Sequence, residues 1–140
     1  MLRVVLDANV YVSALIRPDG PPGEIVKRFL REDSFEIVLS LAIVEDTVRA
    51  FGYPKVRKYI RAGVDPERWL EDVILLAELV AGDHEIKGVS ADADDDKYFA
   101  AAVEGRATLI VTGDPDLLEV KEHRDVRVVT PRAFLNLLLG

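Results

Sequence analysis

The chain has 140 residues, of which 49% are hydrophobic and 31% charged, and it carries a formal net charge of −7. This length fits one domain with one core, the lack of cysteine excludes disulfides and cysteine-ligated zinc, and the acidic balance argues against binding nucleic acid by bulk attraction. The N-terminus lacks the basic, apolar and cleavage regions of a signal peptide, and no apolar run reaches the roughly 20 residues of a membrane span, so we expect a cytoplasmic protein with no membrane partner.

Short apolar runs alternate with helical patterns from the start of the chain. The first third predicts, in order, a strand at 2–6, helices at 9–16 and 21–33, a strand at 35–39 and a helix at 41–51. Ser40 is a natural N-cap for the last of these helices. A short basic helix is expected at 53–63, and a long helix over 65–82 has Pro66 at its first helical position and Gly82 at its end.

The rest of the chain continues this alternation. It predicts, in order, a brief strand within 84–90, a helix at 96–105, a fully apolar strand at 107–112, a helix at 114–120, a strand at 126–129 and a closing helix at 131–139. Strands separated by helices indicate βαβ units and a mostly parallel sheet. The expected fold class is therefore α/β, a single three-layer domain over 1–140 with a central sheet flanked by helices.

Acidic residues follow the predicted strands at the edge where parallel α/β sheets bind ligands. Asp7 comes directly after the first strand, and Asp114 lies two residues beyond the fully apolar strand. Glu45 and Asp46 lie one turn into the helix that leaves the second strand, and the aspartate-rich run 92–96 opens the helix before the Asp114 strand. Four acidic positions that are distant in sequence therefore point to one edge of the sheet.

A cleft that gathers these acids needs a cation. Two carboxylates about 4 Å apart repel by about 4 kcal/mol at an effective dielectric of about 20, so four of them require protons or metal ions to neutralise them. Oxygen-only ligation suits Mg²⁺ or Mn²⁺, and such ions can hold a hydroxide nucleophile and stabilise the leaving oxygen in phosphodiester cleavage. The pattern therefore predicts a divalent-metal site.

Taken one at a time, Asp7 fits a helix cap as well as a ligand position. Asp114 fits a cap better, Glu45 and Asp46 fit solvated helix positions better, and at least two acids of 92–96 fit first-turn positions that the helix dipole favours. Their common edge, not any single residue, favours the metal site. An EF-hand calcium loop beginning at Asp92 is excluded, because Lys97 stands where that loop needs glycine and Val103 stands where it needs glutamate.

Five segments in order resemble a PIN domain, the small metal-dependent ribonuclease fold that supplies many prokaryotic toxins of toxin–antitoxin pairs. They are "VVLDANVYVSAL", "PDGPPGEIVKRFL", "FEIVLSLAIVEDTVRAFGYPKV", "DADDDKYFAAAVEGRATLIVTGDPDLL" and "VRVVTPRAFLNLL". The likeness covers nearly the whole chain. It implies a PIN-like fold, a Mg²⁺- or Mn²⁺-dependent endoribonuclease that acts on RNA as the toxin of such a pair, an antitoxin protein as partner, and a homodimer.

The resemblance also implies which acids form the site: Asp7, Asp46, Asp95 and Asp114. Asp46 stands on the family's glutamate position with Glu45 just before it, so either can be the ligand. The family's "DPDDN" run falls on 92–96, where Ala93 replaces the proline and Asp96 the asparagine. Asp96 therefore stays open as an alternative to Asp95.

Three further residues are expected to support the acids. Asn9 and Thr112 match family positions that buttress the carboxylates, and Thr112 could hydrogen-bond either Asp7 or a water on the metal. Asp116 is a candidate outer ligand, although a surface first-turn acid explains it better.

One basic segment, "YPKVRKYIRAG", is the candidate RNA-binding surface. It contains four cations and two tyrosines, which are Lys55, Arg57, Lys58, Arg61, Tyr53 and Tyr59. Cations beside aromatic rings can hold a single-stranded backbone while bases stack on the rings. A solvated helix face is the alternative interpretation.

The remaining singled-out residues have structural interpretations. Trp69, Val73, Leu76 and Val80 form an apolar stripe that fits the core or a dimer face, and the two histidines, 84 and 123, are expected at the surface. Two rival functions stay open. A metal-dependent phosphatase or phosphotransferase would need a DxD motif where this chain has "DAN", and a non-catalytic regulatory binding module would use its acids only as helix caps.

Overall fold

In the computed structural model, which describes residues 1–83 and 86–140, six strands form one sheet. The strands are β1 (Leu2–Leu6), β2 (Phe35–Ser40), β3 (Glu78–Val80), β4 (Leu109–Val111), β5 (Glu122–His123) and β6 (Val126–Val129). Their order across the sheet is β3-β2-β1-β4-β6-β5. Every neighbouring pair is parallel except β5 with β6, which forms an antiparallel hairpin at one edge.

The helices connect these strands and begin at recognisable capping sequences. They are α1 (Ala8–Ile16), α2 (Pro21–Arg31), α3 (Leu41–Phe51), α4 (Pro54–Arg57), α5 (Pro66–Leu76), α6 (Asp96–Glu104), α7 (Pro115–Val120) and α8 (Pro131–Leu139), with a 3₁₀ turn at Ala93–Asp95. The Ser40 hydroxyl accepts from the Ile43 backbone N–H at 3.4 Å, so the predicted cap of α3 is confirmed.

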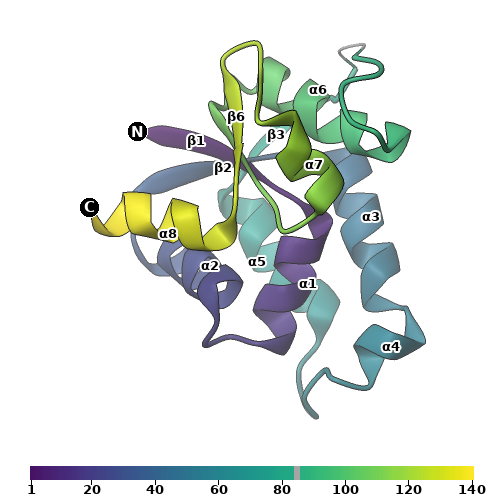
Figure 1. Cartoon of the computed structure of the whole chain (residues 1–140). Coiled ribbons are helices and arrows are strands. Elements are labelled where there is room, and N and C mark those ends of the chain that lie inside the picture. Colours follow the sequence, from purple (N-terminus) through teal and green to yellow (C-terminus); the bar gives the residue numbers. More distant parts are fainter. Residues whose placement is uncertain (84–85) are drawn as a thin grey trace.

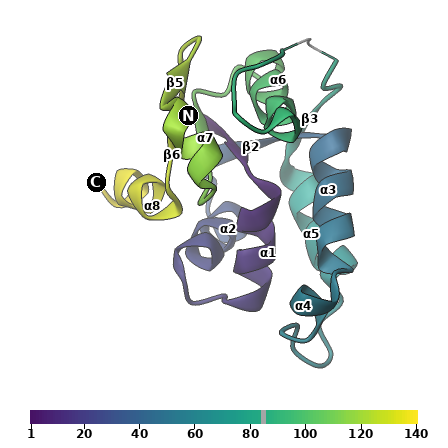
Figure 2. The same cartoon turned by 45° about the vertical axis from the view of Figure 1, so that its right-hand side comes forward.

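Helices cover both faces of the sheet. Helix α6 lies on one side, and α1, α2 and α8 lie on the other (Figures 1 and 2). The central strands are buried on both faces, so side chains of either parity, such as Val4 and Val5, are fully buried. On the α2 and α8 side, the Phe35 ring packs between Phe29 at 5.7 Å and Phe134 at 5.2 Å. The predicted fold class, an α/β domain with helices on both faces of a mostly parallel sheet, is confirmed.

The strand order creates a switch point at the centre of the sheet. From β1 the chain moves to β2 and β3 on one side, then crosses back and adds β4 on the other side of β1. The strands β1 and β4 are neighbours, and the helices that follow them therefore leave the sheet in opposite directions. A crevice at the carboxyl ends of such strands is where α/β proteins bind ligands.

The long helix predicted over 65–82 is wrong in its second half. Helix α5 ends at Leu76, Ala77 has an extended backbone (ψ 158°), and residues 78–80 pair with β2 as an edge strand. The side chain of Arg3 on β1 contacts both Glu36 and Glu78, which ties the new strand to its neighbours. Hydrogen bonding to the backbone of β2 at the open sheet edge outweighed the local helical pattern. A window of local sequence contains no information about that distant partner.

The apolar stripe from Trp69 to Val80 is consequently not one helical face. Val73 is fully buried, and Trp69 packs against Phe51 with ring centroids 6.3 Å apart. Leu76 is 60% exposed at the end of α5, and Val80 belongs to β3. Trp69, Val73 and Val80 therefore contribute to the core from two different elements, and Leu76 does not.

Other boundaries also differ from the predictions. The basic helix expected at 53–63 is an α-helix only over Pro54–Arg57, and turns follow it. The strand expected within 84–90 does not form at 86–90, and residues 84 and 85, which include one histidine, lie outside the described residues. Within the described residues, no helix combines the length and apolarity needed to cross a bilayer.

The sequence does not predict β5 or its hairpin with β6, because the turn between these strands lacks glycine. Arg124 and Asp125 both adopt positive φ angles, 48° and 64°, which two-residue hairpin turns usually assign to asparagine or glycine. The hairpin half-buries His123, whose ring meets Phe99 edge-on at 5.8 Å, so the prediction of a plain surface histidine is wrong for this residue.

Candidate metal and catalytic site

Asp7 ends β1 and caps α1 at the switch point. Its backbone N–H donates to Val111 O on β4 at 3.0 Å, and its side chain accepts from the Asn9 N–H at 3.0 Å. The residue is only 3% exposed. A carboxylate buried to this extent needs hydrogen-bond donors around it.

Two side chains from distant segments supply these donors. The Thr112 hydroxyl donates to Asp7 Oδ2 at 2.7 Å, and the Tyr98 hydroxyl donates to Asp7 Oδ1 at 3.0 Å. Thr112 follows β4 and is fully buried, whereas Tyr98 comes from α6, the helix on the face of the sheet opposite α1. Thr112 therefore makes the contact with Asp7 that was one of its two predicted roles.

Asp114 lies next to Asp7 because β4 is the neighbour of β1. Its backbone N–H donates to Thr112 Oγ1 at 2.9 Å, so this one hydroxyl links both acids. The Asp114 side chain accepts from the Asp116 N–H at 3.0 Å and caps α7. Asp116 is itself exposed and lies outside the pocket that the other acids line.

Asp95 is the buried member of the aspartate run. The 3₁₀ turn carries it inward until only 6% of the residue is exposed, and Ser90 Oγ donates to its Oδ2 at 3.1 Å. Burial raises the pKa of Asp95 to about 6; the Ser90 hydrogen bond opposes the rise, and the charges of Asp114, Asp92 and Asp7 add to it. These charges are therefore close enough to repel one another.

The structure separates the alternatives within this run. Asp95 lines the same pocket as Asp7, whereas the Asp96 Oδ2 atom accepts from the Gly88 N–H at 3.1 Å outside that lining. Asp96 Oδ1 is buried without a hydrogen-bond partner among the described residues, so Asp96 keeps some capacity as a ligand. The geometry nevertheless favours Asp95.

Asp46 faces the pocket from α3, whereas Glu45 points to solvent and lies outside the lining. Asp46 differs from the other acids because both of its oxygens meet cations. Arg49 Nη1 donates to Oδ1 at 2.6 Å, and Lys97 Nζ forms an ion pair with Oδ2. Burial lowers the pKa of Lys97, and the charge of Asp7 opposes that shift.

One pocket of about 210 Å³ collects the predicted acids, together with Asn9: Asp7, Asp46, Asp95 and Asp114. An oxygen-only donor set with this much negative charge fits a hard divalent ion. Within residues 1–83 and 86–140, however, no three acidic or histidine side chains already converge as a ligand cluster. The donor chemistry therefore fits Mg²⁺ or Mn²⁺, while the ligand geometry is not preformed.

Four residues in and around the pocket were missed from the sequence: Arg49, Ser90, Lys97 and Tyr98. The signal for Lys97 was present, because a cation in the first turn opposes the helix dipole and needs a local partner. The signal for Tyr98 was its position on the inward face of the helix that follows the aspartate run. Nothing local marks Ser90 or Arg49.

The predicted RNA-binding segment is exposed but does not converge on one place. Tyr53 lines the acid pocket, Lys55 and Tyr59 line a second hollow of about 580 Å³ beside the start of α2, and Arg61 lines a third. Arg57 and Lys58 are also exposed. Only the Tyr53 end of the segment therefore borders the acids.

A carboxylate pocket at the switch point of a parallel sheet is the class of site that this fold defines. The sequence model of the PIN domain family matches residues 3–116, and the chain belongs to the PIN domain family. A curated relative, an uncharacterized protein of Methanocaldococcus jannaschii, is 28% identical over 144 residues, which cover 96% of this chain and 90% of the relative.

Solved structures share the fold. VapBC2 from Rickettsia felis, bound to a DNA fragment from their promoter, superposes with a TM-score of 0.59 at 12% identity and covers 92% of this chain and 98% of that chain. PAE2754 from Pyrobaculum aerophilum gives 0.54 at 15% identity, covering 99% of this chain and 90% of that chain. At these identities the likeness supports the fold alone.

Proposed function

We propose that this chain is a Mg²⁺- or Mn²⁺-dependent endoribonuclease and the toxin of a toxin–antitoxin pair. The observation that carries the proposal is the shared pocket of Asp7, Asp95 and Asp114, whose mutual repulsion adds to the raised pKa of Asp95. Membership of the PIN domain family, a family of nucleases, supports the hydrolytic activity.

In this proposal a divalent ion supplies the activation of water and the neutralisation of charge that phosphodiester cleavage requires. The acids bind and orient that ion. Thr112 and Tyr98 hold Asp7 in one rotamer by hydrogen bonds at 2.7 and 3.0 Å, and Ser90 does the same for Asp95 at 3.1 Å. The walls of the pocket are thus fixed from separate segments of the chain, which is what an ordered carboxylate site needs.

The substrate would approach across α3 and α4. Tyr53 at the rim of the acid pocket can stack a base, while Lys55, Arg57 and Lys58 hold the phosphate backbone. These cations gather positive charge locally on a chain whose net charge of −7 disfavours binding nucleic acid by bulk attraction.

Two protein partners belong to the proposal. An antitoxin with a cationic tail would suit the net charge of −7 and could cover the acid pocket. VapBC2, which shares the fold, is described with promoter DNA. We also propose a homodimer, supported by exposed leucines at the end of α5 and on β3: Leu75, Leu76 and Leu79.

The test is incubation of the purified chain with a mixed RNA pool and Mn²⁺. Wild type should cleave, chelation by EDTA should stop cleavage, and Asp95→Asn should lose it. Asp72→Asn, an exposed aspartate on α5, is the matched control and should cleave like wild type. Equal cleavage by wild type and Asp95→Asn would reject the site.

Two further measurements distinguish the nuclease from the two alternative functions, a phosphatase and a non-catalytic binding module. Turnover of a small phosphate monoester without cleavage of RNA would favour the phosphatase. A binding module predicts no change in thermal stability on adding Mn²⁺, whereas a real site gains about 2.7 kcal/mol at a hundredfold excess over the dissociation constant.

A further inference from the structure

Lys97 provides a built-in cation on one side of the acid pocket. It lies in the first turn of α6, directly after the aspartate run, and its ammonium group pairs with Asp46 Oδ2. Arg49 Nη1 occupies the other oxygen of Asp46 at 2.6 Å. The Lys97 side chain is only 16% exposed and that of Asp46 24%, so the pair forms part of the pocket wall and not of the open surface.

A lysine at this position is unfavourable by itself. The N-terminus of a helix carries partial positive charge and repels a cation. Burial also strips water from the ammonium group, which costs stability unless a partner compensates. Asp46 is that partner, and the Tyr98 ring, 5.8 Å from Nζ, adds a cation–π contact. The ion pair therefore fixes Lys97 beside the acids.

The other three predicted acids make no direct ion pair with a cation among the described residues, and the charge of Lys97 acts on Asp7 only without a direct contact. Within the part of the chain that the structure describes, the hydrogen-bond donors to Asp7, Asp95 and Asp114 are neutral hydroxyl and backbone N–H groups. The pocket therefore divides into a side where Asp46 pairs directly with cations and a side without a direct ion pair, whose carboxylates are Asp7, Asp92, Asp94, Asp95 and Asp114.

We propose that Lys97 is a positioning residue that keeps Asp46 out of the ion-binding set, so that the pocket takes one divalent ion on Asp7, Asp95 and Asp114. This inference rests on the proposed metal-dependent function. Nuclease sites that use two ions need ligands for both. Here Lys97 supplies fixed positive charge on the side where a second ion would otherwise bind.

The first test counts Mn²⁺ ions and measures their affinity without reference to activity. Apo protein is titrated with Mn²⁺ by calorimetry, and free Mn²⁺ is followed in parallel by electron paramagnetic resonance. Wild type should bind one ion per chain. Asp46→Asn should leave the affinity nearly unchanged, whereas Asp95→Asn should weaken it by about tenfold or more.

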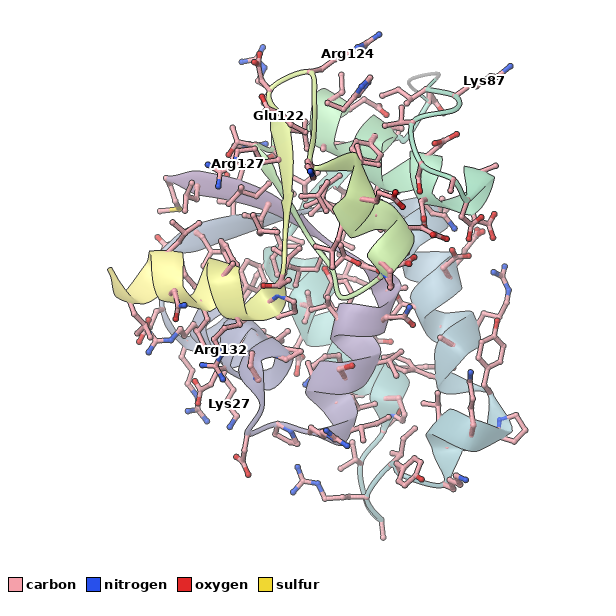
Figure 3. The ribbon with its side chains drawn as sticks, viewed as in Figure 1. Lys27, Lys87, Glu122, Arg124, Arg127 and Arg132 are labelled. Atoms are coloured by element: carbon pink, nitrogen blue, oxygen red, sulfur yellow. The ribbon has the colours of Figure 1, made fainter. Side chains whose placement is uncertain are left out.

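The second test removes the fixed cation. Lys97→Met approximately keeps the length of the side chain and frees Asp46 Oδ2, while Arg49 still pairs with Oδ1, so a second Mn²⁺ per chain should appear at Oδ2. Lys97→Arg retains the charge and should stay at one. Lys27→Met makes the same change in net charge on α2, on the side of the molecule away from α6 (Figure 3), and should also stay at one.

The outcomes separate this inference from the function on which it rests. Two ions bound by wild type, or a loss of affinity in Asp46→Asn as large as in Asp95→Asn, would overturn the role of Lys97 and leave the metal site standing. A single ion in folded Lys97→Met would also overturn it. Wild type that binds no Mn²⁺ would overturn both proposals.

Discussion

The hydroxyl of Tyr98 donates a hydrogen bond to Asp7 Oδ1 at 3.0 Å across 91 positions of sequence. The phenol oxygen in turn accepts from the Ala8 N–H at 3.2 Å, so one side chain joins α6 to the end of β1 and the start of α1. Burial and the charge of Asp7 raise the pKa of Tyr98, which keeps the hydroxyl protonated and able to donate. This contact holds an acid of the site in place.

Removing that hydroxyl should weaken the fold and the site together. Tyr98→Phe leaves a buried Asp7 oxygen with one donor fewer, so the free energy of unfolding should fall by about 1–3 kcal/mol in urea denaturation. RNA cleavage should fall as well. Tyr59→Phe removes an exposed hydroxyl and serves as control. Equal stabilities of the two variants would show that the Asp7 contact contributes nothing.

Loss of the Thr112 hydroxyl should matter more than a change in the size of this side chain. Thr112→Val keeps the shape but removes the donor to Asp7 and the acceptor for the Asp114 N–H, so it should lose about 1–3 kcal/mol of stability and weaken Mn²⁺ binding. Thr112→Ser retains the hydroxyl and should retain most Mn²⁺ affinity in calorimetry. Loss of affinity in the serine variant as large as in the valine variant would contradict this role.

The stability of the metal-free protein should depend on pH through Asp95. Its pKa is raised from 3.8 to about 6 in the folded state, mainly by burial. Between these values the folded chain holds a proton that the unfolded chain has released, so acidification from pH 7 to 4 favours folding. In EDTA, the stability advantage of Asp95→Asn over wild type should shrink by about 2–3 kcal/mol over this range. A stability difference between the two proteins that does not change with pH would contradict the raised pKa of Asp95.

Gly23 should not tolerate a side chain even though it lies in a helix. Alanine normally improves a helix by about 1 kcal/mol relative to glycine, but a Cβ here would lie 2.2 Å from the Pro18 carbonyl oxygen. Because that neighbour is backbone, Gly23→Ala should destabilise the fold by about 1–3 kcal/mol or more. Gly52→Ala, whose Cβ would meet Arg49 O at 3.4 Å, is the control for thermal denaturation.

The basic segment should contribute to RNA affinity by contacting phosphates and not by recognising the base sequence of the RNA. In the Asp95→Asn background, which prevents cleavage, Lys55→Gln with Lys58→Gln should weaken binding to different single-stranded RNAs equally. The slope of log affinity against log salt should fall by about 0.7 for each phosphate that the protein no longer neutralises. Lys27→Gln with Arg132→Gln, on the α2 and α8 side (Figure 3), should leave the slope unchanged. Equal effects of the two pairs would reject a local RNA surface.

The sequence by itself determined the alternation of strands and helices and the edge of the sheet at which the acids gather. Leu2–Leu6, Phe35–Ser40 and Val126–Val129 are short apolar runs whose strand character is local, and Ser40 caps α3 through its own neighbours. Because parallel strands present their carboxyl ends together, the convergence of Asp7 and Asp114 followed once the sheet was predicted.

Only the tertiary structure decided which neighbour each residue meets. The break at Ala77 depends on a free edge of β2, and the position of Asp46, and not Glu45, in the pocket lining depends on how α3 packs. The pairs Tyr98 with Asp7 and Lys97 with Asp46 span 91 and 51 positions. Such contacts arise from packing between distant elements, and the local periodicity of a sequence carries no information about the rotation or partner of an element once it forms.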